Sequence, residues 1–118
     1  MSTRDSGKQG ETMACAYLLR QGYTLLAKNF RMQRYEIDLV MAQGETIVFV
    51  EVKARSAAAN AYISGREAVT RTKQAHIIRA AQGYLRLHNA FARPVRFDVV
   101  EVNLTTGHIT HIPAAFRA

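Results

Sequence analysis

The stretch that decides the fold is residues 36–53, which read Glu-Ile-Asp-Leu-Val-Met-Ala-Gln-Gly-Glu-Thr-Ile-Val-Phe-Val-Glu-Val-Lys. Its β-branched and aromatic composition predicts two strands, 36–43 and 46–53. Gly44-Glu45 separates them as a two-residue turn, and glycine at the first central position suits a type II′ turn. The turn places Gln43 opposite Thr46, so the sequence also predicts the register of the hairpin.

This register gathers charged side chains at one end of one face of the hairpin. Directly opposed residues point to the same face, so Asp38 comes opposite Glu51 and Glu36 comes opposite Lys53. The same face is apolar near the turn, at Val40, Ile47 and Phe49. The other face is wholly apolar and must be covered by another layer; it carries Ile37, Leu39, Met41, Val48, Val50 and Val52.

Two carboxylates at cross-strand distance, roughly 5 Å between Cβ atoms, repel each other unless a positive charge lies between them. Mg²⁺ prefers such hard oxygen ligands. Lys53 follows Glu51 by two residues on the same face, where it can stabilise charge on a phosphate or position a water. The alternative interpretation is a salt-bridge patch in which Glu36 pairs with Lys53 at a solvated strand end. The residue pattern alone leaves both interpretations open.

The remaining sequence predicts two helices and three further strands. Gly22 ends the first helix, and Pro94 precedes the fourth strand. Ser64 and Glu67 have the spacing of a helix-capping box. The order predicts an α/β fold in one domain, residues 1–118, with a mixed sheet and helices on its faces. The expected segments are helix 8–21, strand 23–30, the loop 54–63, helix 70–88 and strands 95–104 and 108–112.

The charge balance favours a polyanionic partner. The 118 residues carry 16 Lys and Arg against 9 Asp and Glu, a net charge of +7, and a basic balance of this kind is typical of proteins that bind nucleic acid. No apolar run approaches the roughly 20 residues that span a bilayer, and the polar N-terminus predicts a cytoplasmic protein. A single cysteine, Cys15, excludes an internal disulfide.

Residues 36–42 and 46–55 resemble the E-I-D-L…F-V-E-V-K-x-R signature of the YraN-like family. That family is a branch of the restriction-endonuclease-like, or PD-(D/E)xK, nuclease superfamily, similar in motif layout to archaeal-type Holliday junction resolvases. The resemblance covers nearly the whole chain, including Gly10-Glu11, Asn29-Phe30-Arg31 and the stretch 96–100. One departure is Tyr35, which stands where the family usually has glycine and places a side chain at the strand entry.

The resemblance implies a restriction-endonuclease-like core and a DNA endonuclease that uses Mg²⁺ or Mn²⁺, with branched or structured DNA as a candidate substrate. The implied catalytic residues are Asp38, Glu51, Lys53 and Glu11. The implied metal ligands are Asp38, Glu51, the Val52 carbonyl and Glu11. The implied phosphate contacts are Arg31, Arg34, Arg55, Lys73 and Gln74.

Related resolvases imply a possible homodimer as well. Two alternatives remain beside the enzyme. One is a catalytically inactive module that keeps the fold and binds nucleic acid or another protein, and the other is a purely structural interaction protein, since fold does not determine function.

Overall fold

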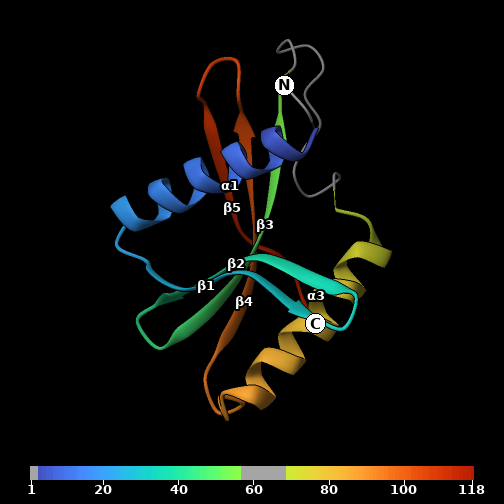
Figure 1. Cartoon of the computed structure of the whole chain (residues 1–118). Coiled ribbons are helices and arrows are strands. Elements are labelled where there is room, and N and C mark those ends of the chain that lie inside the picture. The colour runs from blue at the N-terminus through green and yellow to red at the C-terminus, as the bar shows by residue number, and fades with distance from the viewer. Residues whose placement is uncertain (1–2, 57–68) are drawn as a thin grey trace.

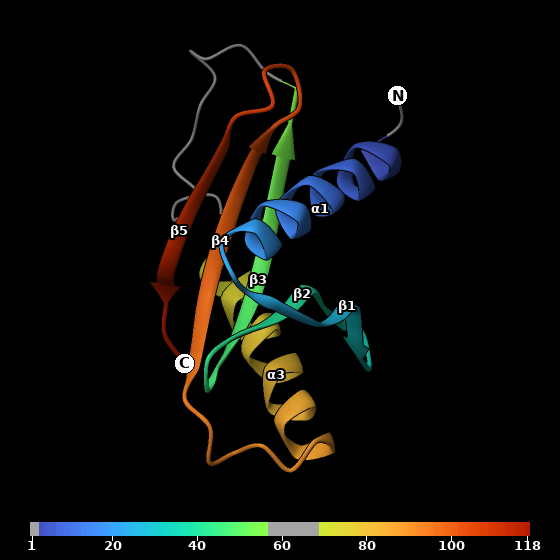
Figure 2. The ribbon, with the colours of Figure 1, turned by 90° about the vertical axis from the view of Figure 1, so that its left-hand side faces the viewer.

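The computed structural model describes residues 3–56 and 69–118, in which five strands form one mixed sheet between two helices. The strand order is β1-β2-β3-β4-β5; β3 and β4 are parallel, and the other neighbours are antiparallel. Helix α1 lies across one face and α3 lies against the other (Figures 1 and 2). The elements are α1 (Thr3–Arg20), β1 (Thr24–Met32), β2 (Tyr35–Gln43), β3 (Thr46–Arg55), α3 (Arg71–Leu87), β4 (Val95–Asn103) and β5 (Ile109–Phe116).

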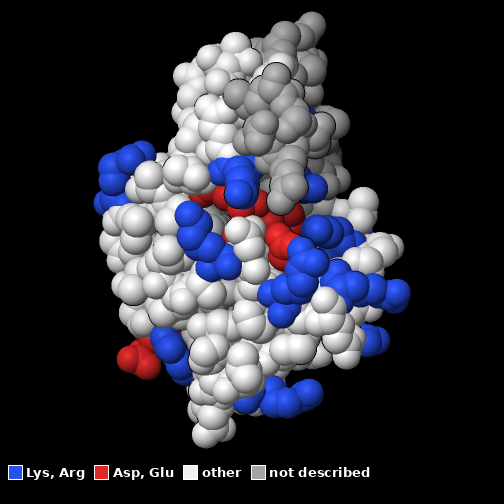
Figure 3. All heavy atoms as spheres, viewed as in Figure 1, with Lys and Arg blue, Asp and Glu red and all other residues white. Residues whose placement is uncertain are grey.

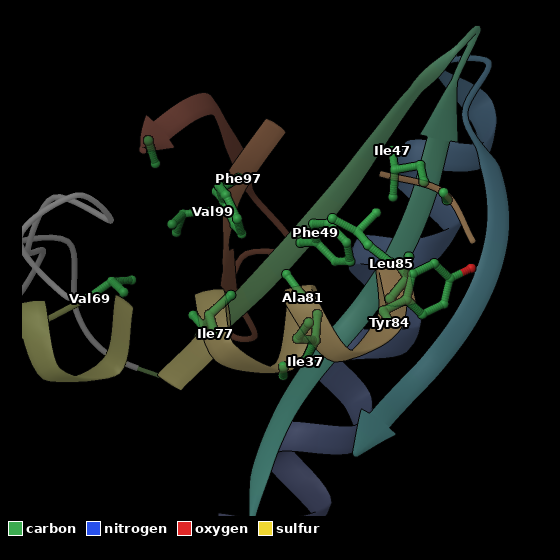
Figure 4. Close-up of a cluster of buried hydrophobic side chains, with 14 residues drawn as sticks. Ile37, Ile47, Phe49, Val69, Ile77, Ala81, Tyr84, Leu85, Phe97 and Val99 are labelled. Carbon is green, nitrogen blue, oxygen red and sulfur yellow. The ribbon is translucent and has the colours of Figure 1, made fainter. Parts of the chain in front are cut away.

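Each face of the sheet has its own apolar cluster. On the α3 side, Phe49 and Phe97 stack and Tyr84 packs edge-on against Phe49 (Figure 4). On the α1 side, Ala14 and Leu18 pack on the sheet with no exposed surface. Burying apolar surface contributes about 25 cal/mol per Å², so the two layers supply the main stabilisation of the fold.

Helix α1 approaches the sheet most closely at Gly10. A Cβ atom at this position would collide with the Cβ of Ala54 on β3, so only glycine allows the contact. The contact holds the first half of α1 over the end of β3. Glu11, the next residue, is thereby brought to the charged end of the central hairpin.

The predicted hairpin register is confirmed from Gln43–Thr46 to Leu39–Val50, with Gly44 at φ +58°. Beyond Leu39, β2 twists away from β3 while it stays paired with β1. The Asp38 carboxylate accepts a hydrogen bond from the backbone N–H of Val52 at 2.8 Å, in place of a strand-to-strand backbone bond.

This divergence makes two sequence-based expectations wrong. Glu36 does not face Lys53: it aligns with Arg31 of β1, while Lys53 aligns with Glu101 of β4. Ile37 was expected beside Leu39 and Met41, but it packs in the cluster on the α3 side. The cause in both cases is the twist of β2, which breaks the simple alternation of faces.

The element boundaries differ from the predictions at several ends. Helix α1 begins at Thr3, earlier than expected, and ends before Gly22, whose φ is +94°. Strand β5 runs on to Phe116 through Pro113, which an edge strand tolerates because no ladder bond is lost. The proposed capping box at Ser64 and Glu67, and the loop beyond Ser56, lie outside the described residues.

Helix α3 begins after Thr70, whose hydroxyl accepts a hydrogen bond from the N–H of Lys73. This cap satisfies one of the open donors of the first turn. Among the helices of the described residues, none is long and apolar enough to cross a membrane.

Candidate functional site

Asp38 and Glu51 come together where β2 separates from β3. The two carboxyl groups share a hydrogen bond, and Asp38 also accepts the N–H of Val52. Glu51 is only 6% exposed, although it is an acid on a central strand. The divergence of the strands therefore leaves two carboxyl groups together in a largely buried position.

Burial raises the pKa of Asp38 from its ordinary 3.8 to about 8, and the charge of Glu51 and its hydrogen bond contribute to the rise. The Val52 N–H and the positive charge of Lys73 act in the opposite direction but are weaker. At neutral pH the pair therefore holds a proton between its oxygens. A divalent cation can replace that proton, because it compensates both charges at once.

The lysine nearest to the two acids comes from α3, and the sequence did not single it out for this place. Lys73 Nζ lies 3.8 Å from Glu51 Oε2. Lys53 is half-buried and lies beside Glu101 in the sheet register. Within the described part of the chain, Lys53 forms no ion pair at 4.0 Å or less. Lys73 therefore pairs with Glu51, whereas Lys53 has no acidic partner within 4.0 Å among the described residues.

Glu11 lies at the border of the site and is held by Asn29. The Asn29 side-chain amide donates to Glu11 at 2.8 Å and to Glu36 at 3.3 Å. Burial raises the pKa of Glu11, and the charges of Asp38 and Glu36 add to this, while the Asn29 hydrogen bond lowers it. The charges of Glu11 and Asp38 therefore interact, but the Glu11 carboxylate is hydrogen-bonded to Asn29.

No group of three or more His, Cys, Asp or Glu side chains in residues 3–56 and 69–118 is arranged to hold a metal ion. The two carboxyl groups of Asp38 and Glu51 are the donors that the fold brings together. Mg²⁺ fits such a site, since it keeps several of its waters and is bound by one or two carboxylates plus substrate phosphate. The expected participation of Glu11 and of the Val52 carbonyl stays a prediction.

Most of the residues expected to contact phosphate already have partners inside the protein. Arg31 binds Glu36 at 2.7 Å, and Arg55 lies 4.0 Å from Glu101. The Gln74 amide donates to the carbonyl of Val69. Arg34 stacks on the ring of Tyr35 at 5.6 Å and is exposed. Figure 3 shows acidic atoms gathered near the middle of this face with Lys and Arg atoms around them, and a separate acidic group at the lower left.

A second polar cluster, absent from the sequence-based predictions, is centred on Asp98 of β4. This carboxylate has no exposed surface and accepts hydrogen bonds from Arg96, His111 and the N–H of Ala114, at 2.7 to 3.0 Å. Burial alone would raise the pKa of Asp98, but these hydrogen bonds outweigh it and lower the pKa. Arg96 also donates to the hydroxyl of Tyr23, so the cluster ties β4 to β5 and to the end of α1. The signal in the sequence was the charged Arg96 and Asp98 at alternate positions of an apolar strand.

Comparison with known proteins gives one consistent result. Residues 10–102 match the model of the uncharacterised protein family UPF0102. A UPF0102 protein of Pseudomonas paraeruginosa is 44% identical over 107 residues, covering 90% of this chain and 84% of its own length. One from Chlorobium chlorochromatii is also 44% identical, over 98% of this chain and 93% of its own.

A more distant relative, from Clostridioides difficile, is 40% identical over 98% of this chain and all of its own length. The family description and the names of these relatives assign no activity. The expected YraN-like relationship is confirmed at the level of the family, and the chain belongs to the uncharacterised protein family UPF0102.

Proposed function

We propose that this protein is a metal-dependent endonuclease of the restriction-endonuclease-like superfamily, which hydrolyses DNA phosphodiester bonds at Asp38, Glu51 and Lys53. The observation that carries the proposal is the pair formed by Asp38 and Glu51. Two carboxyl groups buried in contact are unfavourable unless a proton or a cation compensates them, and the raised pKa of Asp38 expresses that cost.

The topology supports the same proposal. A helix, a three-strand antiparallel meander, a helix and a strand parallel to β3 follow one another in the chain. This is the element order that the resemblance to restriction-endonuclease-like proteins implies. The candidate acids lie on β2 and β3, at the end of the sheet where the strands separate.

The residues have separable tasks in this proposal. Bound Mg²⁺ or Mn²⁺ would polarise the phosphodiester and provide an activated water. Asp38 and Glu51 would hold the cation, and the Val52 N–H keeps the Asp38 carboxylate oriented through its 2.8 Å hydrogen bond. Lys53, which forms no ion pair with the described residues, would neutralise the charge that grows on the phosphate. Lys73 balances the charge of Glu51 at 3.8 Å.

The decisive experiment measures cleavage of branched and linear DNA by purified protein with Mg²⁺, with Mn²⁺ and with EDTA. Glu51→Gln should reduce cleavage by at least a hundredfold, since it removes half of the charge that holds the cation. Glu45→Gln, at an exposed turn position, is the matched control and should cut like the wild type. Equal cleavage by Glu51→Gln would refute the proposal, because the activity would then come from a contaminant.

One observation favours the second candidate, a nucleic-acid-binding module without turnover. Lys73 already lies 3.8 Å from Glu51, so a lysine occupies part of the place that the cation needs. In that case DNA binding would depend on salt and would be indifferent to metal and to Asp38→Asn. Binding assays with EDTA and with Mg²⁺ separate the two candidates.

A further inference from the structure

A polar hollow lies away from the acids, between α3 and the turn that joins β1 to β2. Its volume is about 450 Å³, and Met32 and Gln33 line the side formed by the turn. Arg79, Gln82 and Arg86 line the other side. These three residues follow the helical spacing i, i+3, i+7, so they form one stripe along α3.

Gly83 lets the turn approach the helix at this hollow. A Cβ atom on Gly83 would lie 2.6 Å from Cε and 2.7 Å from Cγ of Met32, closer than real Cβ contacts. The glycine thus allows Met32 to pack directly on α3. The two sides of the hollow are therefore held by packing between α3 and the hairpin.

The charges on α3 are unbalanced. The helix carries Arg71, Lys73, Arg79 and Arg86 and contains no acid. Among the described residues, no carboxylate forms an ion pair with Arg79 or Arg86. Two exposed guanidinium groups and two amide side chains offer donors to the hollow, and guanidinium matches the oxygens of a phosphate in a bidentate manner.

The position of the stripe fits an extended polyanion that passes the acids. Lys73 contacts Glu51, and Arg86 follows Lys73 by thirteen residues, which is about 20 Å along a helix. That length is the axial rise of about six nucleotides of one strand, at roughly 3.4 Å each. Of this length, the stripe from Arg79 to Arg86 covers seven residues, about 10 Å, which is the axial rise of about three nucleotides.

We propose that the hollow formed by Arg79, Gln82, Arg86 and the β1–β2 turn binds backbone phosphates of a nucleic acid, a few nucleotides away from the bond at Asp38 and Glu51. The inference rests on the proposed function for the identity of the polyanion. It adds a second contact region, which holds the flanking part of the substrate and fixes its direction along α3.

The test measures affinity for a labelled DNA duplex between 50 and 200 mM salt, in EDTA so that no cleavage occurs. Each lost phosphate contact reduces the slope of log K against log salt by about 0.9. Arg79→Gln with Arg86→Gln should lower the slope by roughly 1.8, so that the wild type loses about twelvefold more affinity than the variant over this range. Arg79→Lys with Arg86→Lys should restore the slope, since the charges are kept.

The matched control is Lys8→Gln with Arg20→Gln, which removes the same charge from α1. Both residues are exposed on this helix, which covers the face of the sheet opposite to α3 (Figure 2). A slope unchanged in the Arg79/Arg86 variant, or reduced as much in the control, overturns the inference. Because the binding test contains no metal, its result is independent of the cleavage test. The salt slope can show that the hollow does not bind phosphate while Glu51-dependent cleavage is still observed. Phosphate binding in the hollow can likewise be observed when cleavage is not.

Discussion

The half-buried Asp38 and the fully buried Asp98 have surroundings that push their pKa values in opposite directions. Asp38 lies beside Glu51 and receives one backbone N–H bond, and its pKa rises to about 8. Asp98 receives hydrogen bonds from Arg96, His111 and Ala114, and its pKa falls. The number of donors around each carboxylate accounts for the difference.

The comparison separates a structural cluster from a candidate reactive one. The Asp98 carboxylate is fully compensated inside the protein, so it has nothing to offer a ligand. The Asp38–Glu51 pair is under-compensated, so a cation bound there would lower its free energy. Acids whose pKa is raised by burial and a neighbouring charge, as in Asp38, gather at functional sites.

The largest expected effect is on stability, at Asp98. Asp98→Asn should lower the free energy of unfolding by about 3 kcal/mol at pH 7, because it leaves Arg96 and His111 without their anion. Asp38→Asn should be neutral or stabilising, since it removes a charge repulsion and keeps an acceptor for the Val52 N–H. Urea unfolding of both variants tests this, and a reversed order would contradict the comparison.

The next effect is a pH dependence that belongs to Asp38. Its folded-state pKa of about 8 lies above the ordinary 3.8, so between these values the native state holds a proton that the unfolded chain has released. This contribution to stability is complete below about pH 4 and is lost as pH rises through 8, by about 1.4 kcal/mol per pH unit at most. Urea midpoints from pH 5 to 8 in EDTA should show a smaller decline for Asp38→Asn than for the wild type. Identical slopes would mean that the Asp38–Glu51 pair does not hold the proton.

Asp98 should behave in the opposite sense, at acid pH. Its lowered pKa contributes stability that is present above the ordinary value of 3.8 and is lost as pH falls through the folded-state value. In the same unfolding series extended to pH 3, Asp98→Asn should reduce the loss of stability with falling pH, and it should leave the pH dependence at neutral and alkaline pH unchanged. An effect of Asp98→Asn above pH 6 would show that the two clusters are coupled.

Divalent cations should stabilise the protein through the acid pair. For a dissociation constant near 1 mM, Mg²⁺ at 10 mM adds about 1.4 kcal/mol. The gain should be larger at pH 8 than at pH 6, because the cation displaces a proton. Thermal unfolding should show the gain in the wild type and in Glu45→Gln. The same gain in Asp38→Asn would place the cation elsewhere.

The smallest stability effect is expected at Lys73. Its side chain is 42% exposed, so its ion pair with Glu51 is screened by solvent, and Lys73→Gln should change stability by less than about 1 kcal/mol. Its effect on cleavage should be about tenfold, against a hundredfold or more for Lys53→Gln, the lysine that the resemblance implies as catalytic. If Lys73→Gln lost more cleavage activity than Lys53→Gln, the catalytic lysine would be Lys73 of α3.

Much of the fold follows from local rules that the sequence expresses directly. The Gly44-Glu45 turn and the alternation around it predict the hairpin register, and the structure confirms it as far as Leu39–Val50. The apolar stripe of α3 and the helix stop at Gly22 are equally local. The candidate pair Asp38 and Glu51 was predicted from this register, and the two side chains do meet.

The pairings that the sequence missed are those that depend on the twist of β2 and on contacts between distant elements. Glu36 pairs with Arg31, and Lys73 reaches Glu51 from a helix more than twenty residues later. The Asp98 cluster joins residues of β4, β5 and the segment after α1. No local pattern contains such partners.

By itself the sequence determined the hairpin, the two helices and the presence of two acids on adjacent strands, because these depend on periodicity and turn chemistry over a few residues. Only the tertiary structure decided that Asp38 is uncompensated while Asp98 is satisfied. The physical reason is that the charge state of a buried carboxylate depends on which donors the packed elements bring within hydrogen-bonding distance.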